Sequence, residues 1–302
     1  MKYKKAQFQL EWVFAIIVGA MILFLAIYAV SKTISTYKEQ TSAEVSKELS
    51  ILTDPLERGY FSGSADVISM KAETRIYNKC FSDGFGKNEL KAISKTGFGD
   101  WKEPEISVPV YKYIFSSNIE EGKNFYVFSK SFDMPFRITN LIYLTSGSFC
   151  FISPPEEIRE EIENLKIKNI QVSEFLSNCS SESKKVCFEG NCEININPYM
   201  NYVEKSGQQL QYLGNSLMYA AIFSDPGIYT CNLKRLINKI NSVSKIYLEK
   251  ANMLNQRGIS ISDSQLMLFI ELTNNSTDLS LINLQAEEAN RENIENGYKL
   301  WS

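Results

Sequence analysis

The sequence predicts an α+β protein with a membrane-spanning N-terminal helix, and three observations lead to this fold class. A run of 19 uncharged residues extends from Trp12 to Val30. β-Branched and aromatic residues then alternate with polar ones up to about residue 214, which is typical of strands. Beyond that point the apolar period changes from two to about 3.6, which is typical of helices. We therefore expect a long helix over 7–53, a disulfide-bearing β-rich module over 54–214 and a helical module over 215–302.

Composition excludes several classes of function. The 302-residue chain has a net charge of -3, so it lacks the basic surface of a nucleic-acid-binding protein. It contains no histidine, which removes the commonest general base and metal ligand at neutral pH. No local motif suggests catalysis by paired carboxylates or by a Ser-Lys pair. We therefore expect neither enzymatic activity nor a cofactor, a metal or a nucleic acid partner.

The apolar run near the start is long enough to cross a bilayer. A spanning helix needs about 20 apolar residues, and we place the span at about 12–30. Lys2, Lys4 and Lys5 precede the run, so the positive-inside rule puts the N-terminus in the cytoplasm and the C-terminal domain outside. A secretory signal fits less well, because its apolar region is usually shorter and no A-x-A site closes this one.

The N-terminal helix should continue beyond the membrane. Apolar residues recur mostly at spacings of three and four from Ile34 to Leu52, and no Gly or Pro interrupts them before Pro55. At 1.5 Å per residue, a helix over 7–53 would be roughly 70 Å long. Its second part would offer one apolar stripe to a partner outside the membrane. A juxtamembrane stalk is the alternative.

A short motif before the apolar run points to a family. Lys4-Lys5-Ala6 is followed by Gln7 and, four residues later, by Glu11. This arrangement resembles the class III signal sequence of type IV pilins and of archaeal pilin-like and archaellin-like proteins. In that family a prepilin-type peptidase cuts after the small residue on the cytoplasmic side, and the retained helices bundle into a filament core. The resemblance implies cleavage between Ala6 and Gln7, with residues 1–6 as a cytoplasmic leader.

The same resemblance gives Glu11 a role in assembly. A carboxylate at the edge of a bilayer costs free energy unless it has a partner. As the fifth mature residue, Glu11 would pair with the new α-amino group of Gln7 on an adjacent subunit, and this attraction strengthens as water leaves. The implied partners are membrane lipid, the peptidase and other pilin-like subunits that contact the N-terminal helix. A plain signal anchor with an incidental glutamate is the alternative.

The sequence departs from the family pattern in two ways, one of which bears on the type of organism and the other on the type of subunit. Phe8 occupies the second mature position, whereas many bacterial members carry Phe at the first, and this favours an archaeal-type protein. About 250 residues follow the long helix, which is large for a major pilin. We therefore expect a minor subunit or assembly factor of a pilus-like filament or secretion apparatus. A single-pass surface receptor or adhesin that does not polymerise is the alternative.

The cysteine pattern indicates disulfides. All six cysteines follow the membrane segment, and an even number in an exported domain is typical of disulfide pairing. A two-residue turn at Glu189-Gly190 would form a hairpin and set Cys187 opposite Cys192, close enough to bridge. The other four allow three pairings, among which the sequence does not choose: Cys80, Cys150, Cys179 and Cys231. Free structural thiols are the alternative.

The β-rich module contains six strand-like segments and one helix. The helix over 154–166 begins with two prolines and places Ile158 and Ile162 on one face, while its glutamates are expected to form a solvated face. The strand-like segments are separated by Gly, Pro or Asn, and they cover residues 64–77, 106–115, 123–132, 135–145, 148–153 and 184–196.

The helical module should form an αα-hairpin with a capping helix, packed on the strands. A short buried helix is expected over 216–223, and Pro226 begins a long one that ends near Gly258. Two further helices are expected over 263–272 and 277–301, the last ending on a Leu-Trp anchor. We favour simple packing over a groove for the helix of another subunit.

Three N-x-[ST] triplets fall in predicted loops of the exported part. They make Asn178, Asn274 and Asn275 candidate glycosylation sites. Such triplets also arise by chance in a chain rich in Asn and Ser.

Processing gives the first testable prediction. If a prepilin-type peptidase cuts this chain, mass spectrometry of the membrane-extracted protein will find Gln7 at the N-terminus, because the family cleaves after the small residue. Samples run with and without reductant test the disulfides in the same experiment. An intact Met1 or Lys2 end would contradict the prediction.

Overall fold

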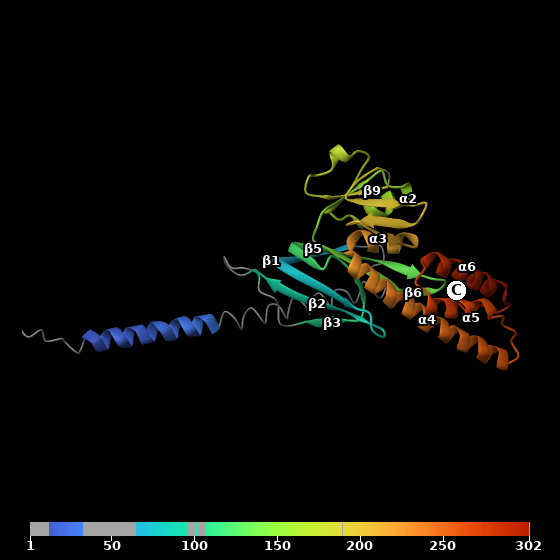
Figure 1. The fold of residues 1–302 in the computed structure, drawn as a ribbon, viewed down its shortest axis with the longest axis horizontal. Helices are drawn as coiled ribbons and strands as arrows, with labels where there is room; N and C mark the ends of the chain where they lie inside the picture. The colour runs from blue at the N-terminus through green and yellow to red at the C-terminus, as the bar shows by residue number, and fades with distance from the viewer. Residues whose placement is uncertain (1–11, 33–64, 96–100, 102–106, 189, 302) are drawn as a thin grey trace, which may run out of the picture.

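The computed structural model describes residues 12–32, 65–95, 101, 107–188 and 190–301. It contains an N-terminal apolar helix, a sheet-rich middle with disulfides and helices at the C-terminal end (Figure 1). The predicted α+β class is therefore confirmed. Of the helix predicted over 7–53, the structure describes Trp12–Lys32, and the remainder lies outside the described residues.

The first sheet is mostly antiparallel and has a buried apolar cluster on each face. Leu141 and Tyr143 belong to one cluster and Ile142 and Leu144 to the other, since successive side chains of a strand point to opposite faces. The strands lie in the order β3-β2-β1-β5-β6-β4. Their bounds are β1 (Ala65–Phe81), β2 (Lys87–Ser94), β3 (Val108–Val110), β4 (Tyr113–Phe115), β5 (Ile119–Asp133) and β6 (Arg137–Thr145).

The first sheet curls so that its two edges approach each other. β3 and β4 lie at opposite edges in the strand order, yet only Tyr111 and Lys112 separate them in the chain. Two residues cannot cross a flat six-stranded sheet, because neighbouring strands are about 4.8 Å apart. The single strand predicted over 106–115 is therefore wrong: β3 pairs with β2, and β4 pairs in parallel with β6.

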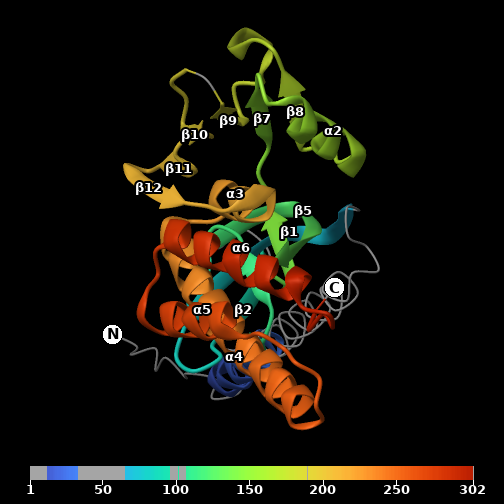
Figure 2. The same cartoon turned by 90° about the vertical axis from the view of Figure 1, so that its right-hand side faces the viewer.

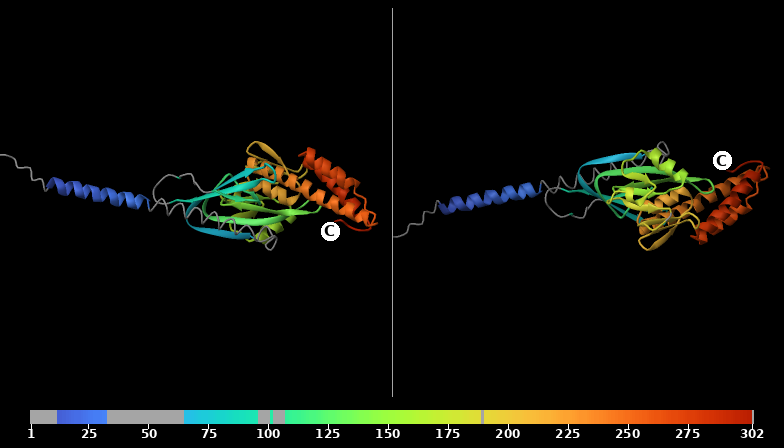
Figure 3. Two further views of the ribbon diagram at one scale, coloured as in Figure 1. Left: turned by 90° about the horizontal axis from the view of Figure 1, so that it is seen from below. Right: turned by 90° about the horizontal axis from the view of Figure 1, so that it is seen from above.

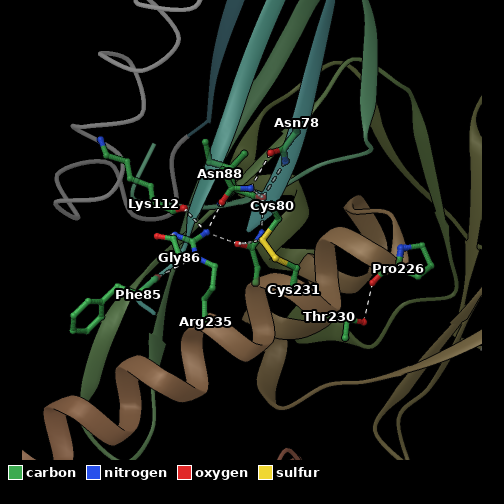
Figure 4. The surroundings of a disulfide bond; sticks show 12 residues. Asn78, Cys80, Phe85, Gly86, Asn88, Lys112, Pro226, Thr230, Cys231 and Arg235 are labelled. Atoms are coloured by element: carbon green, nitrogen blue, oxygen red, sulfur yellow. Dashed lines mark hydrogen bonds between the residues drawn. A yellow bond between two sulfur atoms is a disulfide. The ribbon is translucent and has the colours of Figure 1, made fainter. Parts of the chain in front are cut away.

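Side chains from β1, β2 and α4 (Pro226–Gln256) fill the place where the edges meet (Figure 4). The amide nitrogens of Asn78, Asn88 and Asn232 each donate a hydrogen bond to the carbonyl oxygen of Ile114, at 3.2, 3.3 and 2.8 Å. An edge strand otherwise leaves backbone groups without partners. The three asparagines thus replace the missing strand neighbour of β4 at this point.

Arg235 of α4 joins the same network and carries the only charge in it. Its Nη1 donates to Asn88 Oδ1 at 2.6 Å, to Asn232 Oδ1 at 2.7 Å and to the Lys112 carbonyl at 3.1 Å. The guanidinium also lies 4.7 Å from the centre of the Tyr113 ring. The side chain is 1% exposed and its acceptors are neutral, so burial lowers the pKa of Arg235. The disulfide Cys80–Cys231 joins β1 to α4 beside this network.

The second sheet is mixed, and its central strands are parallel. α2 (Glu156–Leu165) connects β7 to the parallel neighbour β8, and β9 lies on the other side of β7. Figure 2 shows this sheet and α2 on one side of α3, with the first sheet on the other. The order is β12-β11-β10-β9-β7-β8. The bounds are β7 (Phe149–Ile152), β8 (Ile170–Ser173), β9 (Lys184–Cys187), β10 (Ile194–Asn197), β11 (Tyr202–Lys205) and β12 (Gln208–Gln211).

The hairpin predicted around Cys187 and Cys192 is wrong, because β9 and β10 are parallel. In a tight hairpin Ile194 would stand opposite Lys185, on the face that points away from Val186. The parallel register instead sets Ile194 beside Val186, and both side chains are fully buried. Burial of the apolar face therefore decides the direction of β10.

α3 (Gly214–Phe223) lies at the centre of the hydrophobic core. Every residue from Ser216 to Phe223 is buried, and the helix contacts β5 and β6 of the first sheet and β11 of the second. The Phe223 ring packs edge-on against Phe128 and Phe149, with centroids 5.2 and 4.7 Å apart. The boundary predicted between residues 214 and 215 thus falls inside the first turn of a helix that packs on both sheets.

The C-terminal helices lie together beside α4 (Figure 3). They are α5 (Ser264–Asn275) and α6 (Leu279–Glu295). The helix predicted over 277–301 is too long, because α6 ends before Asn296-Gly297, a pair that favours a helix stop. The buried Leu300 and Trp301 follow in irregular chain, and the Asn293 side chain accepts from Leu300 N at 2.6 Å. The predicted Leu-Trp anchor is therefore buried, without being helical.

The network around Arg235 gives a prediction about stability. Arg235→Met should lower the free energy of unfolding by about 3 kcal/mol, because it leaves buried acceptors on Asn88, Asn232 and Lys112 without a donor. Lys234→Met, an exposed neighbour on the same helix, should change it by less than about 0.5 kcal/mol. Thermal unfolding of the detergent-solubilised chain measures both. Equal stability of the two variants would show that the network does not hold the sheet edges.

Candidate functional site

The N-terminal helix is the largest exposed apolar surface of the described residues. The most apolar 18-residue window of Trp12–Lys32 has a mean hydropathy of 2.8, and none of the side chains of this helix is buried. By length and composition this helix could cross a membrane. An apolar surface of this extent needs lipid or another apolar partner. The predicted processing and assembly residues lie outside the described residues: Lys4, Lys5, Ala6, Gln7 and Glu11.

The structure pairs all six cysteines. Cys80–Cys231 joins β1 to α4, and Cys150–Cys179 joins β7 to the residue after the short 3₁₀ helix η1 (Leu176–Asn178). Cys187–Cys192 links the end of β9 to the loop before β10. The sequence left the first two pairs open, because they depend on which strands and helices become neighbours. The sulfurs of the second and third pairs lie together in one small apolar cluster with Ile152.

The three candidate glycosylation residues are exposed, although none of them lies in an irregular loop. Asn178 ends η1 next to a disulfide-bonded cysteine. Asn274 and Asn275 occupy the last turn of α5, where loops were expected.

A cleft of about 400 Å³ lies between β5, α2 and α3. Glu161 of α2 forms an ion pair with Lys130 of β5 and accepts a hydrogen bond from the Tyr219 hydroxyl at 2.9 Å. The Asn215 amide donates to Glu157 at 2.8 Å and to Glu161 at 3.4 Å. The expectation of a wholly solvated acidic face on α2 is wrong, since Glu161 ties the helix to its neighbours.

Three polar groups of this cleft satisfy one another, namely those of Lys130, Glu161 and Tyr219. Burial raises the pKa of the Tyr219 hydroxyl, and the nearby Glu161 carboxylate raises it further, so the phenol stays neutral and acts as a donor. Lys130 and Glu161 neutralise each other within the cleft. The arrangement stabilises the junction of β5, α2 and α3.

A second hollow, of about 370 Å³, lies at the carboxyl ends of β9 and β10. The outward side chains of β10 and β11 form its floor, where Asn195 faces Glu204 and Asn197 faces Tyr202. The lining is rich in amides and tyrosines and includes no Lys or Arg. It comprises Phe188, Gly190, Asn191, Asn195, Ile196, Asn197, Pro198, Tyr199, Tyr202 and Glu204.

A buried lysine on the opposite face of β11 holds the end of α3. The Lys205 ammonium donates to the carbonyl oxygens of Ile222 at 2.8 Å and Ser224 at 2.9 Å. The last carbonyls of a helix have no partner within the helix, and a cation there is favoured by the helix dipole. Burial, together with the charge of Lys184 as a smaller cause, lowers the pKa of Lys205 from 10.5 to about 8.

The described residues contain no group of three or more His, Cys, Asp or Glu side chains placed to hold a metal ion. Comparison with protein-family models, with curated proteins and with solved structures finds no match to this chain. Its function is therefore argued from the residues and their geometry alone.

The pKa of Lys205 predicts how stability depends on pH. Between pH 8 and 10.5 the unfolded chain keeps a proton that folded Lys205 has released, so stability should rise with pH in that range. The buried hydroxyls of Tyr219 and Tyr229 have raised pKa values and act in the opposite direction above pH 10. Unfolding temperatures measured from pH 8 to 10 should therefore rise less in Lys205→Met than in the wild type. If the unfolding temperatures of the wild type and Lys205→Met change equally with pH, the lowered pKa of Lys205 is contradicted.

Proposed function

We propose that this chain is a membrane-anchored, pilin-like surface protein without enzymatic activity. Its role would be that of a minor subunit or assembly factor of a type IV pilus-like filament or secretion apparatus. The N-terminus lies in the cytoplasm, and the two sheets and C-terminal helices lie outside the cell. A prepilin-type peptidase removes residues 1–6, and Glu11 then pairs with the freed amine of a neighbouring subunit.

One observation carries the proposal: a membrane-length helix with no buried side chain follows directly after Lys4-Lys5-Ala6 and Glu11. Lipid alone would satisfy the apolar side chains of the helix. It would not satisfy a carboxylate at the membrane edge, for which a charged partner is needed. Three disulfides in the folded part agree with an exported domain, because such bonds persist in oxidising surroundings.

A second candidate function is a single-pass surface receptor or adhesin that does not polymerise. The hollow at the ends of β9 and β10 favours it, because that hollow presents exposed polar and aromatic side chains away from the core. Tyrosine and asparagine provide the rigid contact area and adaptable hydrogen bonds that recognition surfaces use.

Crosslinking in native membranes separates the two functions. Single cysteines placed along residues 14–28 should capture homotypic or pilin-like partners if the helices bundle. Glu11→Ala should leave membrane insertion intact and reduce capture severalfold, because the acid loses its amine partner. Glu39→Ala, a matched change beyond the apolar run, should leave capture unchanged. Absence of any captured partner, with the exported domain still accessible at the surface, would favour the non-polymerising receptor.

A further inference from the structure

The hollow at the carboxyl ends of β9 and β10 is open, and several of its polar groups lack partners. Asn195 and Asn197 are engaged in local hydrogen bonds with Cys192, Tyr199, Met200 and the Tyr202 hydroxyl. By contrast, no described residue donates to the Glu204 carboxylate or pairs with the Asn191 amide or the Tyr199 hydroxyl, and all three residues are exposed. These groups are thus available to a ligand.

The hollow lies to one side of the point where the connections of the second sheet diverge. The chain leaves β7 through α2 towards β8, whereas it leaves β9 towards β10, so this point lies between β7 and β9. No residue of β7 lines the hollow, which is formed by the chain after β9 and by β10 and β11. The hollow begins at Phe188, directly after β9, and extends along β10 to Tyr199.

The charge of the side chains that line the hollow limits which ligands could bind there. Among the described residues of the lining, Glu204 is the one with a charged side chain, so an anion such as a phosphate would be repelled and would find no Lys or Arg there. A Lys or Arg side chain would meet Glu204, but its cationic head group cannot accept a hydrogen bond from the Asn191 amide or the Tyr199 hydroxyl. A lone exposed ion pair is also worth only about 0–1 kcal/mol. The lining therefore favours a neutral ligand that both donates and accepts hydrogen bonds.

A ligand with hydroxyl groups on neighbouring carbons meets this requirement, because each hydroxyl both donates and accepts hydrogen bonds. The two oxygens of Glu204 can accept from two such hydroxyls. The Asn191 amide can donate to one ligand oxygen and accept from another hydroxyl. The Tyr199 ring is 94% exposed, and its apolar face can cover the C–H face of a sugar ring while its hydroxyl stays wet. A volume of about 370 Å³ lies within the usual range of small-ligand sites and gives room for one or two such rings.

We propose that this hollow binds a neutral saccharide, with Glu204 and Asn191 holding its hydroxyls and Tyr199 covering one ring face. The inference goes beyond the proposed function, because it assigns a ligand to the exported part whether or not the N-terminal helices assemble. The cleft at Lys130 and Glu161 is a weaker candidate for a ligand site, because the Lys130, Glu161 and Tyr219 side chains already pair with one another.

Ligand-observed NMR on the full chain tests the proposal. The protein is kept in a polyoxyethylene detergent, because a maltoside headgroup would itself compete. The probes are maltose, cellobiose, lactose and N,N′-diacetylchitobiose. At least one should bind with a dissociation constant of about 1 mM or tighter. Tyr199→Ala and Glu204→Gln should each weaken that binding by about tenfold.

Matched controls keep the result interpretable. Tyr111→Ala removes another exposed tyrosine, on the first sheet, and should leave saccharide binding unchanged. Unfolding temperatures of the Tyr199 and Glu204 variants should equal that of the wild type, because both side chains are exposed. No saturable binding of any probe at about 10 mM would overturn the proposal. So would unchanged affinity in both variants, or binding of a Lys-Arg dipeptide in place of the sugars.

Discussion

The closure of the first sheet by a buried arginine is the interaction on which the rest of the folded part beyond the N-terminal helix depends. β3 and β4 lie at opposite edges of a six-stranded sheet but are two residues apart in sequence, so the sheet must curl. The curl brings backbone groups of β4 into the interior without a strand beside them. Arg235 and three asparagines supply the missing hydrogen bonds. Because two of these residues belong to α4, closing the sheet also fixes the helix against it.

α3 joins the two sheets, because it packs against strands of both. The helix is apolar on all sides, and such a helix is stable only when it is buried all round. It packs against β5 and β6 on one side and β11 on the other. Its C-terminal carbonyls are buried as well and are satisfied by Lys205, a residue of β11. The inward face of β11 packs against α3, and its outward face forms part of the floor of the hollow.

The cleft and the hollow differ in whether their polar groups already have partners within the protein. In the cleft between β5, α2 and α3, acid, base and phenol are matched to one another, and their arrangement joins three elements. In the hollow at the ends of β9 and β10, Asn195 and Asn197 shape the turn, while the exposed groups around them lack partners among the described residues. A site that holds its shape through some polar groups and presents others is suited to recognition. The N-terminal helix is suited to anchoring, because its surface is apolar throughout.

The sequence by itself determined the elements whose signal is local. The apolar run, the long helix from Pro226 and the alternation over 64–77 each depend on residues near one another in the chain. Strands with many polar residues were not predicted from the sequence. β2 has the sequence KNELKAIS, and which of its side chains are buried depends on its pairing with β1. Tertiary structure alone decided the pairings Cys80–Cys231 and Cys150–Cys179, the parallel course of β10 and the hollow beside it. The physical reason is that each of these depends on which apolar faces share one core, and residues far apart in sequence settle that question together.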